Sequence, residues 1–173
     1  MRHFKQALSI VVFVTAASIS ASSQSNGPDV SAQNAAIVRA HHELMNKGDW
    51  KAALNNFSED TTNFGNAAGR DGVAMILQDV WATFPDFRLE IVDLVAKDDW
   101  VVVRCRESGT HLGVGKLPVN GGLLVDVPAT HRHFEVEATH WWKVRDGKIV
   151  DHYGVRDDLG MMEQLGLLVG PKR

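Results

Sequence analysis

The chain has 173 residues, of which 45% are hydrophobic and 23% are charged, and its formal net charge is −3 at pH 7. These proportions are those of one globular domain with a sizeable core, and they exclude a fibrous or largely disordered protein. The small acidic excess also argues against nucleic acid as a partner, because binding to phosphates needs a basic patch.

Residues 1–23 have the layout of a secretory signal peptide. A basic start precedes the apolar run 7–14, and small residues follow, which is the order in which such signals are built. The apolar run is shorter than the roughly 20 residues of a membrane-spanning helix. We therefore expect export, to the periplasm or the exterior, without stable membrane insertion; an uncleaved anchor is the alternative. Residues 24–30 are expected to be a flexible linker and residues 31–170 the folded domain.

Three helices and a short strand are predicted in the first half of the domain. Apolar residues recur there at helical spacing, and Gly48, Asp49 and Pro85 supply stop and cap signals. The predicted segments are a helix over 31–47, a helix over 50–57, a short strand over 61–64, and a helix that follows the turn 69–72 and ends before Pro85.

From Phe87 onward the apolar pattern changes from helical spacing to alternation. The Gly- and Pro-rich stretch 109–128 is expected to be a loop over the mouth of a pocket. Helices followed by antiparallel strands indicate the α+β class, with a strongly bent sheet wrapped around a helix and a cavity at one end. The predicted segments are strands over 87–95, 100–111, 133–144 and 148–155, and a short helix over 158–165.

Two histidines are placed toward the ends of apolar rows. Residues two apart on a strand share a face, so His111 shares its face with Cys105, and His140 shares its face with Trp142. For either histidine alone, this position favours a hydrogen-bonded core residue. Cys105, the only cysteine, is predicted to be a buried apolar side chain.

The turn at 145–147 decides whether His152 joins this group. A three-residue loop pairs His140 with His152 on one apolar wall, whereas a two-residue Asp-Gly loop pairs His140 with Tyr153 and turns His152 to the opposite face. The first is favoured because it groups Val150 with the apolar row. His140 and His152 are then candidate catalytic residues, since histidine changes charge near neutral pH.

Asp157, His41 and His42 are further candidates near the pocket. Asp157 is either surface charge beside a helix cap at Asp158 or a group at the pocket rim that orients a catalytic histidine. His41 and His42 diverge by about 100° on a helix, so at most one is expected to touch the pocket. The histidines lack the tight spacing of a zinc motif, and no metal is expected.

Several motifs in one order resemble the SnoaL-like polyketide cyclase (ester cyclase) family, over about residues 35–168. The resemblance implies the cone-shaped fold of the nuclear-transport-factor-two-like superfamily, in which a curved antiparallel sheet wraps around N-terminal helices and encloses a pocket. Members are often homodimers through the open sheet. The matching motifs are Phe84–Phe87, Asp99–Arg104, Gly109–His111, Asp146–His152 and Gln164–Gly166.

The resemblance also implies aldol ring closure without metal or cofactor. By motif, His111 and His140 match pocket histidines of the family and Asn63 matches a pocket asparagine. The family's catalytic aspartate lies two residues after His152, where this chain has Gly154, and extra residues lie between about 121 and 132, as a lid or as part of a different substrate pocket. The candidate substrate-binding residues are Asn63, His111, Trp142 and Trp81.

These features lead to two main functional hypotheses. The first is an exported, cofactor-free cyclase, isomerase or dehydratase that acts on a small organic molecule by histidine acid–base chemistry, an ester cyclase-like lyase or isomerase. The second is a non-catalytic small-molecule binding protein of the same fold, which the glycine at position 154 favours. A dimerising scaffold with a packed core and no pocket is a third option.

Overall fold

The computed structural model describes residues 29–168. The predicted signal peptide and the linker up to residue 28 lie outside these residues, so both stay predictions. The elements are α1 (Val30–Asn46), α2 (Trp50–Ala53), the 3₁₀ helix η1 (Leu54–Asn56), β1 (Thr62–Asn63), β2 (Asn66–Ala67), α3 (Gly69–Thr83), β3 (Arg88–Lys97), β4 (Trp100–Thr110), the 3₁₀ helix η2 (Val119–Gly122), β5 (His133–Arg145), β6 (Lys148–Arg156) and α4 (Asp158–Gln164).

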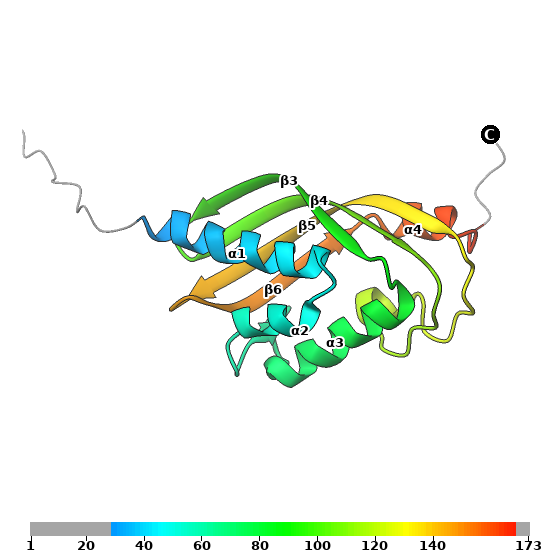
Figure 1. Cartoon of the computed structure of the whole chain (residues 1–173), viewed down its shortest axis with the longest axis horizontal. Coiled ribbons are helices and arrows are strands. Elements are labelled where there is room, and N and C mark those ends of the chain that lie inside the picture. Colours follow the sequence, from blue (N-terminus) through cyan, green and yellow to red (C-terminus); the bar gives the residue numbers. More distant parts are fainter. Residues whose placement is uncertain (1–28, 169–173) are drawn as a thin grey trace, which may run out of the picture.

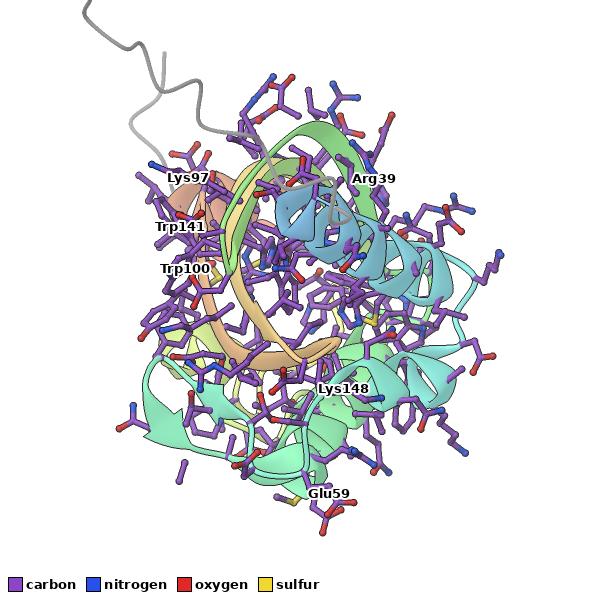
Figure 2. All side chains as sticks on the ribbon, turned by 90° about the vertical axis from the view of Figure 1, so that its left-hand side faces the viewer. Arg39, Glu59, Lys97, Trp100, Trp141 and Lys148 are labelled. Carbon is purple, nitrogen blue, oxygen red and sulfur yellow. The ribbon has the colours of Figure 1, made fainter. Side chains whose placement is uncertain are left out.

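The main sheet is antiparallel and has the strand order β3-β4-β5-β6, beside a small β1-β2 ribbon. Helices α1, α2 and α3 lie on one side of this sheet, and α4 lies at its end (Figure 1). Seen from the end, the sheet bends around the space between these helices (Figure 2). The predicted α+β class is confirmed, with a curved sheet wrapped around N-terminal helices.

Helix α1 begins one residue earlier than predicted because Asp29 is its N-cap, not Ser31. The Asp29 carboxylate accepts from the Ser31 amide at 3.0 Å, and the Ser31 hydroxyl accepts from the Asp98 amide in the β3–β4 turn. The side chains that α1 buries follow helical spacing and face the sheet. They are Asn34, Val38, His41, His42 and Met45.

The β5–β6 hairpin differs from the favoured prediction. Arg145 pairs with Lys148, so the loop has two residues. These residues, Asp146 and Gly147, have φ values of 50° and 73°, the left-handed conformations that a tight hairpin turn needs. The three-residue loop is therefore wrong.

A β-bulge after Lys143 then shifts the register by one residue. His140 lies opposite Gly154, and His152 lies opposite Trp142. The predicted direct pairing of His140 with His152 is wrong, but the bulge keeps both rings on the concave face as diagonal neighbours. Neither loop length alone would have produced this arrangement.

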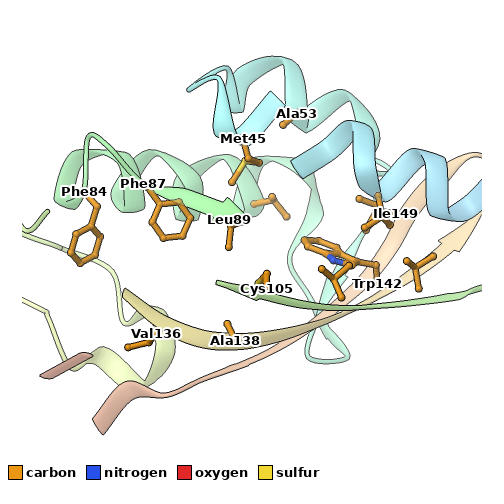
Figure 3. Close-up of a cluster of buried hydrophobic side chains, with 14 of the residues drawn as sticks. Met45, Ala53, Phe84, Phe87, Leu89, Cys105, Val136, Ala138, Trp142 and Ile149 are labelled. Carbon is orange, nitrogen blue, oxygen red and sulfur yellow. The ribbon is translucent and has the colours of Figure 1, made fainter. Parts of the chain in front are cut away.

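The hydrophobic core lies between the helices and the concave face of the sheet (Figure 3). Cys105 is buried there as predicted, and burial raises the pKa of its thiol to about 12. Each fully buried aliphatic side chain contributes about 1.5–3 kcal/mol to stability. Between residues 29 and 168, the structure has no helix that is both long and apolar enough to span a bilayer.

Candidate functional site

A cavity of about 830 Å³ lies between the concave face of the sheet and α3. Its wall on the α3 side is mostly apolar and includes Val73, Ile76 and Val80, with Asp79 as a charged group among them. Most of the other polar groups lie on the strands, and α1 and α4 add one each. They include Asn63 of β1, Glu107 of β4, His140 of β5, His152 and Arg156 of β6, His41 of α1 and Asp158 of α4.

The loop between β4 and β5 closes one side of this cavity. Leu117, Leu123 and Leu124 line it, so part of the extra segment predicted near 121–132 is pocket wall. The Asp79 carboxylate of α3 accepts from the backbone amides of Lys116 and Leu117 at 2.8 and 3.2 Å. These bonds attach the loop to α3.

Gly113 allows the loop to start directly against the end of α3. A Cβ atom at this position would lie 1.8 Å from the Ala82 carbonyl oxygen, which no side chain tolerates. The Gly113 amide donates to the Thr83 carbonyl at 3.1 Å. A glycine here is thus a condition for the position of the pocket wall.

His140 and His152 form the central contact of the site. His140 Nδ1 and His152 Nε2 are 2.9 Å apart, and His152 Nδ1 is 3.0 Å from Asn63 Oδ1. An amide oxygen only accepts, so His152 carries its proton on Nδ1 and accepts on Nε2. His140 therefore donates from Nδ1. The structure brings together the two predicted catalytic histidines and the predicted asparagine.

Glu107 and Arg156 extend this line of contacts on the other side of His140. Glu107 Oε2 lies 3.7 Å from His140 Nε2, beyond hydrogen-bond length, and Glu107 Oε1 accepts from Arg156 Nη1. The exposed fractions of the Glu107 and Arg156 side chains are 4% and 11%. Burial works against ionisation of Glu107, yet the contacts with His140 and Arg156 hold its pKa below the ordinary value.

Two more histidines from α1 pack against this pair. His41 lies 5.0 Å from Trp142 and His42 lies 6.3 Å from His140, between ring centroids. Burial lowers the pKa of His41 to about 4, and burial with the neighbouring histidines lowers that of His42 to about 3. Burial and the same neighbours also lower the pKa of His152 well below 6.5. Of the α1 histidines, His41 lines the cavity.

Among the remaining predicted site residues, Trp142 lines the cavity beside His152, at 4.2 Å between ring centroids. Trp81 does not belong to the described wall of the cavity and packs against Phe87 at 5.4 Å. A tryptophan on the apolar face of a helix can pack in the core or line a cavity, and the sequence pattern does not distinguish these two positions.

His111 and Asp157 are not part of the histidine cluster. His111 is fully buried at the far end of β4, where its Nδ1 lies 3.2 Å from the Thr130 hydroxyl. The described cavity wall does not include it. Asp157 is exposed and caps α4, accepting from the Gly160 amide at 2.8 Å. The cap interpretation is therefore the one that the structure supports, one residue earlier than predicted.

Glu107 and Arg156 are site residues that the sequence analysis missed. Neither residue is among the site residues predicted from the sequence. A signal was present, since Glu107 shares the face of Val103 and Cys105 and is the one carboxylate in that apolar row. A carboxylate at a core-facing position of a strand needs a partner, and Arg156 is that partner.

The described part of the chain has no set of three or more histidine, cysteine, aspartate or glutamate side chains placed to hold a metal ion. The chemistry that these residues offer is proton transfer, since the polar wall carries two imidazoles in direct hydrogen-bond contact beside an ion pair.

Comparisons with known proteins find one family over most of the domain. The family model of the SnoaL-like polyketide cyclases matches residues 35–165. The nogalonic acid methyl ester cyclase of Streptomyces nogalater is 34% identical over 107 residues, which cover 61% of this chain and 73% of that enzyme.

Two solved structures share the fold. IdmH of Streptomyces antibioticus superposes with a TM-score of 0.62 at 29% identity, covering 78% of this chain and 99% of IdmH. A SnoaL-like polyketide cyclase of Agrobacterium tumefaciens gives a TM-score of 0.64 at 20% identity, covering 77% of this chain and 98% of that one. The curved sheet, the cavity beside it and the match over most of the domain lead to one conclusion: the chain belongs to the SnoaL-like polyketide cyclase family.

Proposed function

We propose that this protein is a cofactor-free cyclase or isomerase that moves a proton on a carbonyl compound held in its cavity. The observation that carries the proposal is the 2.9 Å contact between His140 and His152, in the wall of an apolar cavity of about 830 Å³. Ligand pockets of roughly 300–1,000 Å³ enclose small organic molecules of several rings.

In an intramolecular aldol closure, the histidine pair would take a proton from a carbon next to a carbonyl group. The resulting enolate carbon attacks a second carbonyl carbon, and the alkoxide that forms takes the proton back from the pair. Substrate and product are isomers, so no oxidant or leaving group is involved. Asn63 accepts from His152 through its oxygen, which leaves its NH₂ group as the part that can donate to a substrate carbonyl.

For the substrate class, the relative from Streptomyces nogalater is named for nogalonic acid methyl ester. We propose for this chain an ester-bearing polyketide or a similar neutral carbonyl compound. The cavity wall is mostly apolar. The Arg156 guanidinium already donates to the carboxylates of Glu107 and Asp158, which neutralise its charge. Both features favour a neutral ligand.

The proposal is tested by following deuterium exchange at the acidic C–H of 1,3-dicarbonyl compounds by NMR, with purified protein. His140→Gln and His152→Gln are expected to slow exchange by about 100-fold or more, the usual contribution of a general acid–base group. His133→Gln, an exposed histidine of the same strand as His140, is the matched control and should leave the rate unchanged. Equal rates in all four proteins would contradict the proposal.

A non-catalytic binding protein is the second candidate, and Gly154 is the observation that favours it. The family resemblance places a catalytic aspartate at this position, and glycine has no group that transfers a proton. A ligand that raises the melting temperature, but is recovered unchanged after long incubation, would support this alternative.

Export and dimerisation belong to the proposal as well. The layout of residues 1–23 supports export, and N-terminal sequencing of the protein from a secretion-competent host would test it. A groove on the convex face, lined by Phe64, Trp100, Trp141 and Tyr153, supports a homodimer. Trp141 is 47% exposed and lies with Trp100 on the side away from the helices (Figure 2). Trp141→Glu should yield monomers in light scattering if this face joins two copies.

A further inference from the structure

Glu107 is a buried carboxylate whose two oxygens have different partners. One oxygen is bonded to Arg156, which also donates from Nε to Asp158 at 2.8 Å. The other faces His140 Nε2 at 3.7 Å. A buried salt bridge does not by itself indicate a functional role, because apolar residues can often replace such a pair without loss of stability. The contact with His140 is what needs an explanation.

The hydrogen-bond directions supply that explanation. Asn63 fixes the His152 proton on Nδ1, so His140 must donate from its Nδ1. His140 Nε2, which has no hydrogen-bond partner among the described residues, is then the position at which this line of groups can gain or lose a proton. A positively charged imidazole at His140 would face the Glu107 carboxylate directly.

We propose that Glu107, kept ionised by Arg156, is a positioning residue that holds the charge formed on the His140–His152 pair during proton transfer. This inference rests on the proposed function and deepens it. When the pair takes a proton from the substrate carbon, the imidazolium forms opposite Glu107, and when the proton returns to the alkoxide, Glu107 is still a carboxylate. Glu107 itself neither gains nor loses a proton.

The other groups around the pair do not supply this counter-charge. From α1, His41 and His42 face it, and both are neutral near pH 7 because burial lowers their pKa values. From β6 and α4, Arg156 and Asp158 are bonded to one another. From β5, Trp142 stacks on His140 without charge. Among these described groups, Glu107 is the carboxylate in contact with the pair.

Two substitutions with opposite effects on charge test the proposal without any substrate. The readout is the pH at which the coupled pair takes up a proton, followed by ¹⁵N NMR of the imidazole nitrogens; this midpoint belongs to the pair and not to one ring. Glu107→Gln removes the negative charge and should lower the midpoint by about one pH unit or more, whereas Arg156→Gln removes the positive charge and should raise it.

Charge-preserving variants are the matched controls. Glu107→Asp and Arg156→Lys should keep the midpoint near that of the wild type, and Glu137→Gln, an exposed carboxylate on β5, should not move it. Midpoints that shift in the same direction in Glu107→Gln and Arg156→Gln, or that do not move, would overturn the role of Glu107. If Glu107→Gln does not fold, the midpoints of Arg156→Gln and Arg156→Lys are compared instead. A raised midpoint in Arg156→Gln alone supports the role of Glu107, and equal midpoints overturn it.

The outcome is separable from that of the proposed function. Opposite midpoint shifts in a protein without turnover would support the role of Glu107 as counter-charge and contradict the cyclase. Loss of exchange activity in His140→Gln, together with an unmoved midpoint in Glu107→Gln, would support the cyclase and reject Glu107. In an active protein, Glu107→Gln should also displace the acidic limb of the pH–rate profile to lower pH.

Discussion

At the scale of single residues, Gly154 controls how closely the two catalytic candidates approach. A Cβ atom at position 154 would lie 3.1 Å from His140 Nδ1 and 3.3 Å from His152 Cε1. We expect Gly154→Ala to lengthen the contact between the two rings and to slow C–H exchange by about tenfold or more, since small misplacements of catalytic groups cost up to 100-fold.

The matched control for this substitution is Gly72→Ala in α3. A Cβ atom there would lie 3.5 Å from the Ala68 Cβ, an ordinary contact, and alanine favours a helix by up to about 1 kcal/mol. Melting temperature and exchange rate should be measured for both variants. Gly154→Ala with wild-type exchange would show that the 2.9 Å contact is not needed for proton transfer.

At the scale of single residues, part of the site could be predicted from the sequence. The alternating pattern placed His140 and Trp142 on the concave face, and the structure confirms both. The alternating pattern does not show how far along a strand a residue lies. It therefore made His111 as strong a candidate as His140, although His111 lies at the C-terminal end of β4, away from the histidine pair. Glu107 could have been found by the same parity, because a buried carboxylate requires a buried cation.

At the scale of elements, the strands followed from alternation, but the hairpin register did not. Alternation fixes which residues share a face, and the pairing of two strands also depends on turn length and on bulges. The two-residue turn puts Ile149, fully buried, into the core in place of Val150. No sequence signal predicts the bulge after Lys143, and it is this bulge that returns His152 to the concave face.

The loop that closes the cavity offers a prediction at this scale. Asp79→Ala removes the acceptor of two backbone amides, at Lys116 and Leu117, and a lost hydrogen bond costs about 1 kcal/mol or more. We expect amide exchange at these two positions to speed up about tenfold, and ligands to bind more weakly because residues of this loop line the cavity.

Asp126→Asn is the control on the same loop, since among the described residues the Asp126 side chain bonds only the exposed Lys116 side chain, with exposed fractions of 69% and 67%, and asparagine tolerates the positive φ of this position. Exposed pairs of this kind contribute little, so amide exchange should stay close to wild type. Hydrogen-exchange mass spectrometry compares the two variants directly. Equal protection of the loop in Asp79→Ala and the wild type would mean that packing alone holds it.

At the scale of the whole molecule, the cavity and the core share one buried cluster of imidazoles. His41, His42 and His152 are held neutral by burial, so the interior that positions the catalytic candidates is stable only while these rings stay unprotonated. The fold thus couples the site to the stability of the domain, and the coupling depends on pH.

The direction of this dependence follows from linkage. The unfolded chain protonates histidine near pH 6.5, whereas the folded protein protonates His41 at about 4 and His42 at about 3. Between these values the unfolded state binds more protons, so stability falls as pH falls. We expect the melting temperature to decrease steadily as the pH falls from 6.5 to 4.

His42→Leu isolates this effect, because neither nitrogen of His42 has a hydrogen-bond partner among the described residues and leucine therefore loses no bond. The variant should match or exceed the wild-type melting temperature below pH 6 and should show a shallower decrease, by up to about 1.4 kcal/mol per pH unit for one proton. His131→Leu, at an exposed position, should keep the wild-type slope. Parallel curves for His42→Leu and the wild type would mean that His42 takes up no proton when the domain unfolds, and the buried imidazole cluster would then not be the source of acid sensitivity.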